Sequence, residues 1–181
     1  MIHPNSYRAG IIAAGISVVW TIIAYLVGID LFTNWWMGII IFIVVIVYLI
    51  IALKGIRTQL GGFISFKDAF LNFLVMSVIH IVISQIIYFL LIHVIDPGFG
   101  EAVTDATIEK TIAMMEGFGA PEVTIEETLI NMEVEMEKQA TFLGALMNML
   151  KGVAFMAVVG LIVAAILKKN PPVFENTETV D

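Results

Sequence analysis

The sequence predicts an all-α membrane protein whose four transmembrane helices form one bundle over residues 1–169. Hydrophobic residues make up 60% of the chain and charged residues only 14%, whereas soluble domains carry about 25% charged residues. Four apolar runs have the roughly 20 residues that a helix needs to cross a bilayer. These runs occupy residues 9–27, 35–53, 69–95 and 143–167. The nearly unbroken aliphatic stretch at 37–51 lacks the alternating polarity of a membrane β-strand.

The first run, residues 9–27, follows Arg8 as the apolar part of a signal peptide would. It is long enough to span the bilayer, however, and it lacks a clear small-residue cleavage site near its end. We therefore expect a retained helix. Gly10 and Ala14 are four residues apart, a spacing that lets two helix backbones approach closely in lipid. They form a candidate interface, either inside the bundle or between two copies of the chain.

The second run, residues 35–53, is rich in Ile and Val, so we expect it to face lipid over much of its length. In the connection that follows, Ser65 and Asp68 have the spacing of a capping box. The Ser65 hydroxyl would accept a hydrogen bond from the Asp68 amide, and Asp68 would reach back to the Ser65 amide. This motif predicts the start of the third helix. A regulatory or ligand-binding loop is the alternative.

The third run, residues 69–95, is the most polar of the four. Its polar residues are spaced by three, four and four, which places them on one helix face about 80° wide, with a glutamine beside it. This candidate polar intramembrane face consists of Ser77, His80, Ser84, Gln85 and Tyr88. Polar side chains in hydrocarbon need partners, so we expect this face to point into the bundle.

The connection at 96–141 carries eleven acidic and two basic residues. Asp96-Pro97 predicts the end of the third helix, because proline disfavours helix at the residue before it. Two shorter helices are expected next, over 104–116 and from Pro121 onward, as an external amphipathic hairpin. The apolar stripe of the second contains Ile125, Leu129, Met132 and Met136. Two such helices cannot build their own core, so they must cover each other, the bundle, lipid or a partner.

The fourth run, residues 143–167, contains one charge, Lys151. Lys151 is expected near the outer membrane interface, where its side chain would extend toward water. Pairing with an external carboxylate, or lining a hydrated cleft, are the alternatives, so Lys151 is a further candidate interface residue. The acidic segment 170–181, which begins Asn-Pro-Pro, is expected to be a disordered cytoplasmic tail.

The basic residues predict the orientation, because cytoplasmic segments collect Lys and Arg. Bases stand before the first run, between the second and third runs and after the fourth, whereas the other two connections are acidic. We therefore expect a multi-pass inner (cytoplasmic) membrane protein. Both termini would be cytoplasmic and the 96–141 connection periplasmic. The net charge of −7 does not suit nucleic acid, which attracts basic surfaces.

Three features together resemble a known family. They are the segment GGFISFKDAF at 61–70, the acidic connection opening with Asp96-Pro97, and the Gly-containing last helix ending in Ile-Leu-Lys-Lys at 166–169. The chain resembles, from about Arg8 to Lys169, the Bacteroidetes integral membrane family catalogued as domain of unknown function 4199. The resemblance implies a four-helix inner-membrane protein of a Gram-negative bacterium. It brings no activity, cofactor or catalytic residue.

No residue pattern predicts enzymatic chemistry. His80 is the strongest single candidate, as a proton relay or ligand-binding group, but a histidine bonded across helices is the simpler interpretation. Ser17 with His80 supplies the residue types of an intramembrane serine protease without a recognisable oxyanion donor. The three histidines are too far apart to share a metal, and the sequence contains no cysteine. We expect no catalytic residue, metal site or cofactor.

These observations favour a non-enzymatic protein that acts through assembly, as an accessory or scaffold subunit. The small-residue face and the amphipathic hairpin would contact a protein partner or a second copy, and lipid would surround the bundle. The alternative is a small-molecule or ion conduit, or a lipid-binding protein, that uses the polar face of the third helix. That alternative requires a hydrated or ligand-filled cavity beside His80.

Overall fold

The computed structural model describes residues 1–139 and 141–171, and this part of the chain is mostly helical, with an isolated β-bridge and no strand. The predicted all-α class is confirmed. The helices, in chain order, are α1 (Pro4–Val27), α2 (Ile29–Phe32), α3 (Trp35–Gln59), α4 (Phe66–Leu90), the π-helical turn η1 (Leu91–Ile95), α5 (Pro97–Gly117), α6 (Glu122–Gln139) and α7 (Phe142–Leu167). Most of the predicted tail, from residue 172 on, lies outside the described residues.

Four of these helices, α1, α3, α4 with η1, and α7, are long and apolar enough to cross a membrane. They correspond to the four predicted runs and extend beyond each of them, in α7 by a single residue. A helix continues until its backbone is capped, whatever its polarity. Thus α1 begins at Pro4, because Pro suits the first helical turn and His3 Nδ1 accepts the Asn5 amide at 3.2 Å. Likewise α3 continues through polar residues to Gln59.

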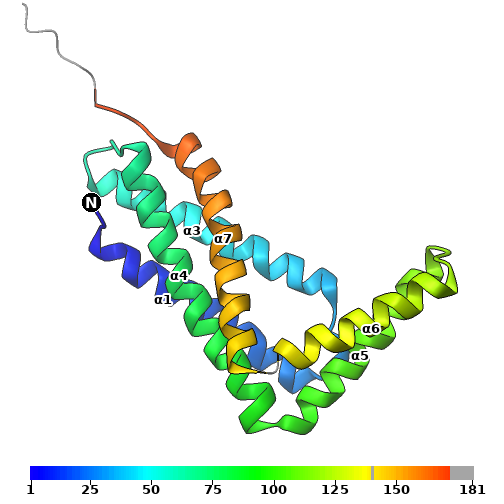
Figure 1. The fold of residues 1–181 in the computed structure, drawn as a ribbon. Coiled ribbons are helices and arrows are strands. Elements are labelled where there is room, and N and C mark those ends of the chain that lie inside the picture. The colour runs from blue at the N-terminus through cyan, green and yellow to red at the C-terminus, as the bar shows by residue number, and fades with distance from the viewer. Residues whose placement is uncertain (140, 172–181) are drawn as a thin grey trace, which may run out of the picture.

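Helix α4 is the centre of the bundle and packs against α1, α7 and α3 (Figure 1). Glycines permit its closest approaches. A Cβ added to Gly10 of α1 would lie 2.8 Å from the Cβ of Ile79, and one added to Gly160 of α7 would lie 2.8 Å from the ring of Phe73. The most polar of the long helices is therefore the one most shielded by its neighbours.

The buried core gathers at one end of the bundle, where the C-terminal halves of α3 and α7 meet the N-terminal half of α4. Its largest fully buried apolar side chains are Leu49, Leu53, Ile56, Phe73 and Met76. Hydrogen bonds tie the chain together at the same end. Ile64 and Lys169 form an antiparallel pair with two backbone bonds of 2.9 Å. The chain's N-terminus and the end of α7 also lie there (Figure 1). This end is closed, and the opposite end is less tightly packed.

The junction between α4 and α5 differs from the expected loop. The first connecting helix begins at Pro97, seven residues earlier than the predicted 104. Asp96 is the N-cap: its Oδ1 accepts the Phe99 amide at 2.9 Å, and proline occupies the first helical position. The Asp-Pro pair thus ends one helix and starts the next without an intervening loop.

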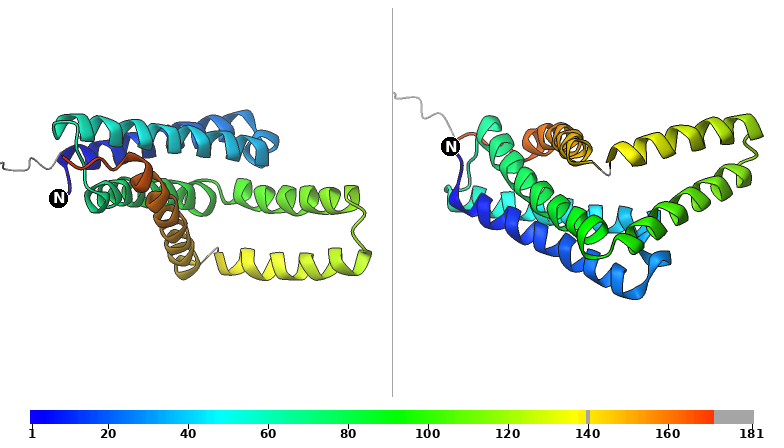
Figure 2. Two further views of the ribbon diagram at one scale, coloured as in Figure 1. Left: turned by 90° about the horizontal axis from the view of Figure 1, so that it is seen from above. Right: turned by 60° about the horizontal axis from the view of Figure 1, so that its bottom comes forward.

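Helices α5 and α6 run antiparallel and project away from the bundle (Figures 1 and 2). Residues 118–121 join them at the far tip. From Glu122 to Lys138 no residue is buried, although the predicted stripe of α6 is half-buried. Helix α7 then starts separately at Phe142, where the Thr141 hydroxyl accepts the Gly144 amide at 3.0 Å. The hairpin therefore meets the bundle only at its base.

Candidate functional site

The five residues of the predicted polar face occupy three different environments along α4. Ser77 is fully buried, and its hydroxyl donates to the Phe73 carbonyl oxygen one turn earlier at 2.9 Å. His80 reaches across to α1, where its Nε2 lies 2.9 Å from Ser17 Oγ. The remaining three residues continue toward the less tightly packed end. Only part of the face is therefore used to hold the bundle together.

Two buried polar atoms of this face have no hydrogen-bond partner among the described residues. They are His80 Nδ1 and Ser84 Oγ, one helical turn apart on α4. Burying an unpaired polar group costs about 1–3 kcal/mol.

Ser17 and His80 lie at the distance that a nucleophile and its general base require. A hydrolase also needs an acceptor that orients the histidine ring and a space for substrate. The other ring nitrogen, Nδ1, has no acceptor among the described residues, and Ser17 lies mid-helix in the α1–α4 contact. The arrangement fits a cross-helix hydrogen bond.

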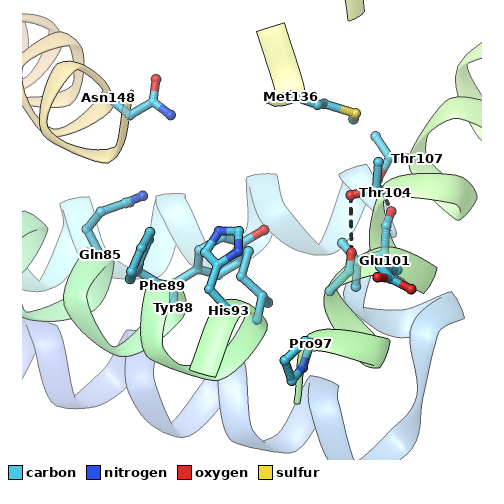
Figure 3. Close-up of a pocket in the computed structure, with 13 residues that line it drawn as sticks. Gln85, Tyr88, Phe89, His93, Pro97, Glu101, Thr104, Thr107, Met136 and Asn148 are labelled. Carbon is cyan, nitrogen blue, oxygen red and sulfur yellow. Dashed lines mark hydrogen bonds between the residues drawn. The ribbon is translucent and has the colours of Figure 1, made fainter. Parts of the chain in front are cut away.

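A cleft of about 430 Å³ lies between the base of the α5–α6 hairpin, the C-terminal half of α4 and the N-terminal half of α7 (Figure 3). Five elements contribute to its wall. The lining residues are Gln85, Tyr88, Phe89, Ile92, His93, Pro97, Gly100, Glu101, Val103, Thr104, Thr107, Met136 and Asn148. Two residues of the predicted polar face, Gln85 and Tyr88, thus belong to this cleft.

The helix geometry explains how the wall is built. Gln85 and Phe89 are one turn apart on α4, and the π-helical turn carries His93 onto the same side, with the Phe89 and His93 ring centroids 4.5 Å apart. Asn148 and Met136 enter the space from the opposite side, from α7 and α6 (Figure 3). Apolar and amide-bearing side chains therefore face each other across the cleft.

The α5 side of the cleft presents hydrogen-bond acceptors. The Thr104 hydroxyl donates to the Gly100 carbonyl oxygen at 3.1 Å, and the Thr107 hydroxyl donates to the Val103 carbonyl oxygen at 2.7 Å. Each hydroxyl has a single hydrogen, so only the lone pairs of these oxygens remain for a ligand. The exposed carboxylate of Glu101 stands beside them.

A network of aromatic and polar contacts holds the base of the hairpin against α1 and α2. The Tyr25 hydroxyl donates to Asp96 Oδ2 at 2.9 Å. The Phe99 ring packs edge-on against Tyr25, with centroids 4.7 Å apart. Lys110 Nζ donates to Asp30 Oδ1 at 3.3 Å and to Thr33 Oγ1 at 2.7 Å. The cleft is therefore held open by fixed contacts on its far side.

The other predicted site residues lie away from the cleft. Gly10 and Ala14 are buried inside the bundle, so this pair is occupied within the chain. Lys151 is exposed, and no carboxylate of the described residues lies within ion-pair distance of it. Ser65 caps α4 at the closed end by accepting the Asp68 amide at 3.1 Å. The Asp68 carboxylate returns to the Ser65 hydroxyl at 2.7 Å, not to the backbone amide expected from the sequence.

Several cleft residues carry no sequence signal that would single them out. Asn148 sits in an apolar stretch, and Thr104 and Thr107 in an ordinary helical segment, while Met136 is predicted only as part of the apolar stripe of α6. Only the fold brings them beside Gln85. Within the described residues, no three His, Asp or Glu side chains come together as a metal site.

A family model described as "Protein of unknown function (DUF4199)" matches residues 8–169. The match covers nearly all of the four long helices and the whole hairpin, and it confirms the family resemblance expected from the sequence. Comparison with curated proteins gives no match, and comparison with solved structures gives none either.

Proposed function

We propose that this chain, which belongs to the family described as Protein of unknown function (DUF4199), is a non-enzymatic membrane protein that binds a small amphipathic molecule. The binding site is the cleft between the α5–α6 hairpin and the outer ends of α4 and α7. The observation that carries the proposal is the joint construction of this cleft by α4, η1, α5, α6 and α7.

The size and wall chemistry of the cleft suit such a ligand. Its volume of about 430 Å³ lies within the roughly 300–1,000 Å³ of small-molecule sites. Phe89, Val103 and Met136 supply apolar wall, while the amides of Gln85 and Asn148 supply directional hydrogen bonds. Ligand pockets combine apolar wall with polar groups that fix the orientation of the ligand, and this wall contains both kinds of side chain.

A one-sided binding site fits the packing better than a conduit does. A conduit needs a path between both membrane faces, but Leu49, Phe73 and Met76 fill the closed end of the bundle and are fully buried. Ser84 and His80 extend the polar face inward from the cleft, but their unpaired atoms are buried and neither residue lines it. The ligand would therefore enter and leave at the hairpin end.

Filling the cleft tests the proposal. Thr104→Phe places a ring in the space that Thr104 lines, and Thr124→Phe adds the same ring at an exposed position on α6. After purification in mild detergent, native mass spectrometry should find a co-purifying small molecule on the wild type and on Thr124→Phe. The molecule should be absent from Thr104→Phe. Equal retention by both variants, or a bare wild-type protein, would contradict the proposal.

We also propose that the protein resides in a bacterial inner membrane, with both termini cytoplasmic and the α5–α6 hairpin periplasmic. Basic residues flank the closed end of the bundle, and eleven acidic residues lie in or beside the hairpin. This asymmetry supports a cytoplasmic closed end by the positive-inside rule. The family resemblance supports a host among the Bacteroidetes.

A second candidate function, assembly with a protein partner as an accessory or scaffold subunit, is favoured by the uncovered outer face of α6. Val123, Ile130 and Val134 there are 67%, 57% and 45% exposed. A protein bound along α6 would cover them. If α6 is a docking helix, a recurrent partner should co-purify with the wild type and be lost from Ile130→Asp. A wild-type protein that runs alone in mild detergent would count against this function.

A further inference from the structure

We infer that the cleft selects an amphiphile with a cationic, ammonium-type head group. This inference rests on the proposed function, since it specifies the ligand of the same cleft. Three independent properties of the wall carry it: its formal charge, its surplus of hydrogen-bond acceptors and its aromatic faces.

The formal charge of the wall is negative. Glu101 is the one carboxylate among the thirteen lining residues, and neither lysine nor arginine is among them. The two lysines of the hairpin region are engaged elsewhere: Lys110 contacts Asp30, and Lys138 contacts Glu135 at 3.2 Å. Lys151 of α7 is exposed and does not line the cleft. An anionic head group would therefore meet repulsion without a compensating base.

The hydrogen-bonding capacity of the wall favours a donor or a cation. The hydroxyl hydrogens of Thr104 and Thr107 are directed to carbonyl oxygens of α5 itself, so these residues offer acceptors only. The amides of Gln85 and Asn148 each offer an acceptor oxygen and two N–H donors, so the surplus of acceptors comes from Thr104, Thr107 and Glu101. An ammonium group has N–H or positively polarised C–H bonds to direct at such oxygens.

The aromatic side chains of the wall add to this preference. Tyr88 and Phe89 line the cleft together with the imidazole of His93. The face of an aromatic ring attracts ammonium groups by about 0.5–1 kcal/mol at exposed sites. The apolar residues around them suit the hydrocarbon part of the same molecule.

The acidic hairpin would raise the local concentration of such a ligand. Between residues 96 and 141 there are eleven acidic and two basic residues, and they lie along the hairpin whose base forms part of the cleft wall. A surface of one sign attracts ligands of the opposite sign and speeds their arrival. This long-range effect adds to the contact with Glu101 and should weaken as salt rises.

Three probes with the same six-carbon tail test the inference: hexyltrimethylammonium, 1-hexanol and hexylsulfonate. Their binding to the full-length protein in nanodiscs is measured by equilibrium dialysis, with empty nanodiscs subtracted. We expect saturable binding of the ammonium probe, weaker binding of hexanol and none of the sulfonate. Glu101→Gln should weaken the ammonium probe about two- to fivefold, the range of an exposed charge contact, and leave hexanol unchanged.

The matched control is Glu116→Gln, which removes the same charge from an exposed position of α5 outside the cleft. It should leave the affinity of the ammonium probe within twofold of wild type. Equal binding of all three probes, or equal effects of the two variants, would overturn the cationic preference. In that case, hexanol binding that is blocked by Thr104→Phe would still support the cleft as a binding site. No saturable binding of any probe by a folded wild type would overturn both.

Discussion

Asn72 is a buried polar residue on which the closed end of the bundle depends. Its Oδ1 accepts the His3 amide and the Ser6 hydroxyl, both at 2.7 Å, and its Nδ2 donates to the Asp68 carbonyl oxygen at 2.6 Å. Ser6 is itself fully buried. One side chain therefore satisfies polar groups from the start of α1 and from α4, in a place that water does not reach.

Asn72→Ala should lower the free energy of unfolding by about 1–3 kcal/mol, because it leaves the buried Ser6 hydroxyl without a hydrogen-bond acceptor. The control is Asn131→Ala, which removes the same side chain from an exposed position on α6. Thermal unfolding of the two variants in one detergent would compare them. Similar midpoints would show that Asn72 does not stabilise the closed end.

Ser17 and Ser84 provide a contrast between a paired and an unpaired hydroxyl. Ser17→Ala removes the partner of His80 Nε2 and should destabilise the protein by about 1–2 kcal/mol. Ser84→Ala removes a buried hydroxyl that has no partner among the described residues, so stability should be unchanged or higher. Parallel detergent melts would measure both, and a larger loss for Ser84→Ala would refute this assignment.

Gly10 and Gly15 make a matched test of close helix packing on α1. An Ala Cβ at Gly10 would lie 2.8 Å from the Ile79 Cβ and 2.9 Å from the Met76 carbonyl oxygen, whereas one at Gly15 would meet nothing within 4 Å. Gly10→Ala should therefore cost about 1–3 kcal/mol through overpacking. Gly15→Ala should be neutral or stabilising by up to about 1 kcal/mol. The expected order of melting temperatures is Gly15→Ala, wild type, Gly10→Ala.

At the scale of elements, the apolar runs were enough to predict the four long helices, because each run has the length of a bilayer crossing. Their ends were less predictable. An apolar run predicts how far a helix contacts lipid, whereas capping residues determine where the helix ends. For this reason α1 and α3 continue into polar residues. The Asp96-Pro97 pair also has two meanings, as a helix stop and as an N-cap with first-turn proline. The helix-stop meaning alone predicts a start of α5 that is seven residues too late.

The cleft itself could be predicted only in part. Periodicity on α4 identified Gln85 and Tyr88, because residues of one helix face are related by local geometry. Asn148 belongs to α7, whose approach depends on how α7 packs against α4, and Glu101 belongs to α5, whose approach depends on the angle at which the hairpin leaves the bundle. That angle is set by the π-helical turn and by contacts such as Tyr25 with Asp96, which join residues 71 positions apart. No local pattern encodes such contacts.

Tyr25→Phe should loosen the base of the hairpin. It removes the hydroxyl that donates to Asp96, and a hydrogen bond to a charged group contributes about 1.5–3 kcal/mol. Peptides from the first turns of α5 should exchange amide hydrogen faster by mass spectrometry, while α3 stays unchanged. Tyr7→Phe, at an exposed position of α1, is the control. Equal exchange in both variants would show that the Tyr25 contact does not fix the hairpin.

At the scale of the whole molecule, the two ends of the bundle differ in packing and in charge. The closed end contains the fully buried apolar core and is tied by the Ile64–Lys169 pair. The hairpin end contains the cleft and most of the acidic residues. A rigid end that anchors the helices and a looser end that admits ligand is the division expected of a binding protein whose site opens to one side of the membrane.

The orientation of this asymmetric molecule can be measured directly, because the native chain contains no cysteine. Single cysteines at Glu126 on α6, Thr58 near the end of α3 and Asn170 after α7 would report the two ends. In cells whose outer membrane has been permeabilised, an impermeant maleimide should label only the Glu126 position. The other two should react after the inner membrane is opened, since basic segments remain in the cytoplasm. Labelling of both Glu126 and Asn170 while the inner membrane is intact would place the two positions on the same side of it. That result would contradict a chain that crosses the membrane an even number of times and starts and ends in the cytoplasm.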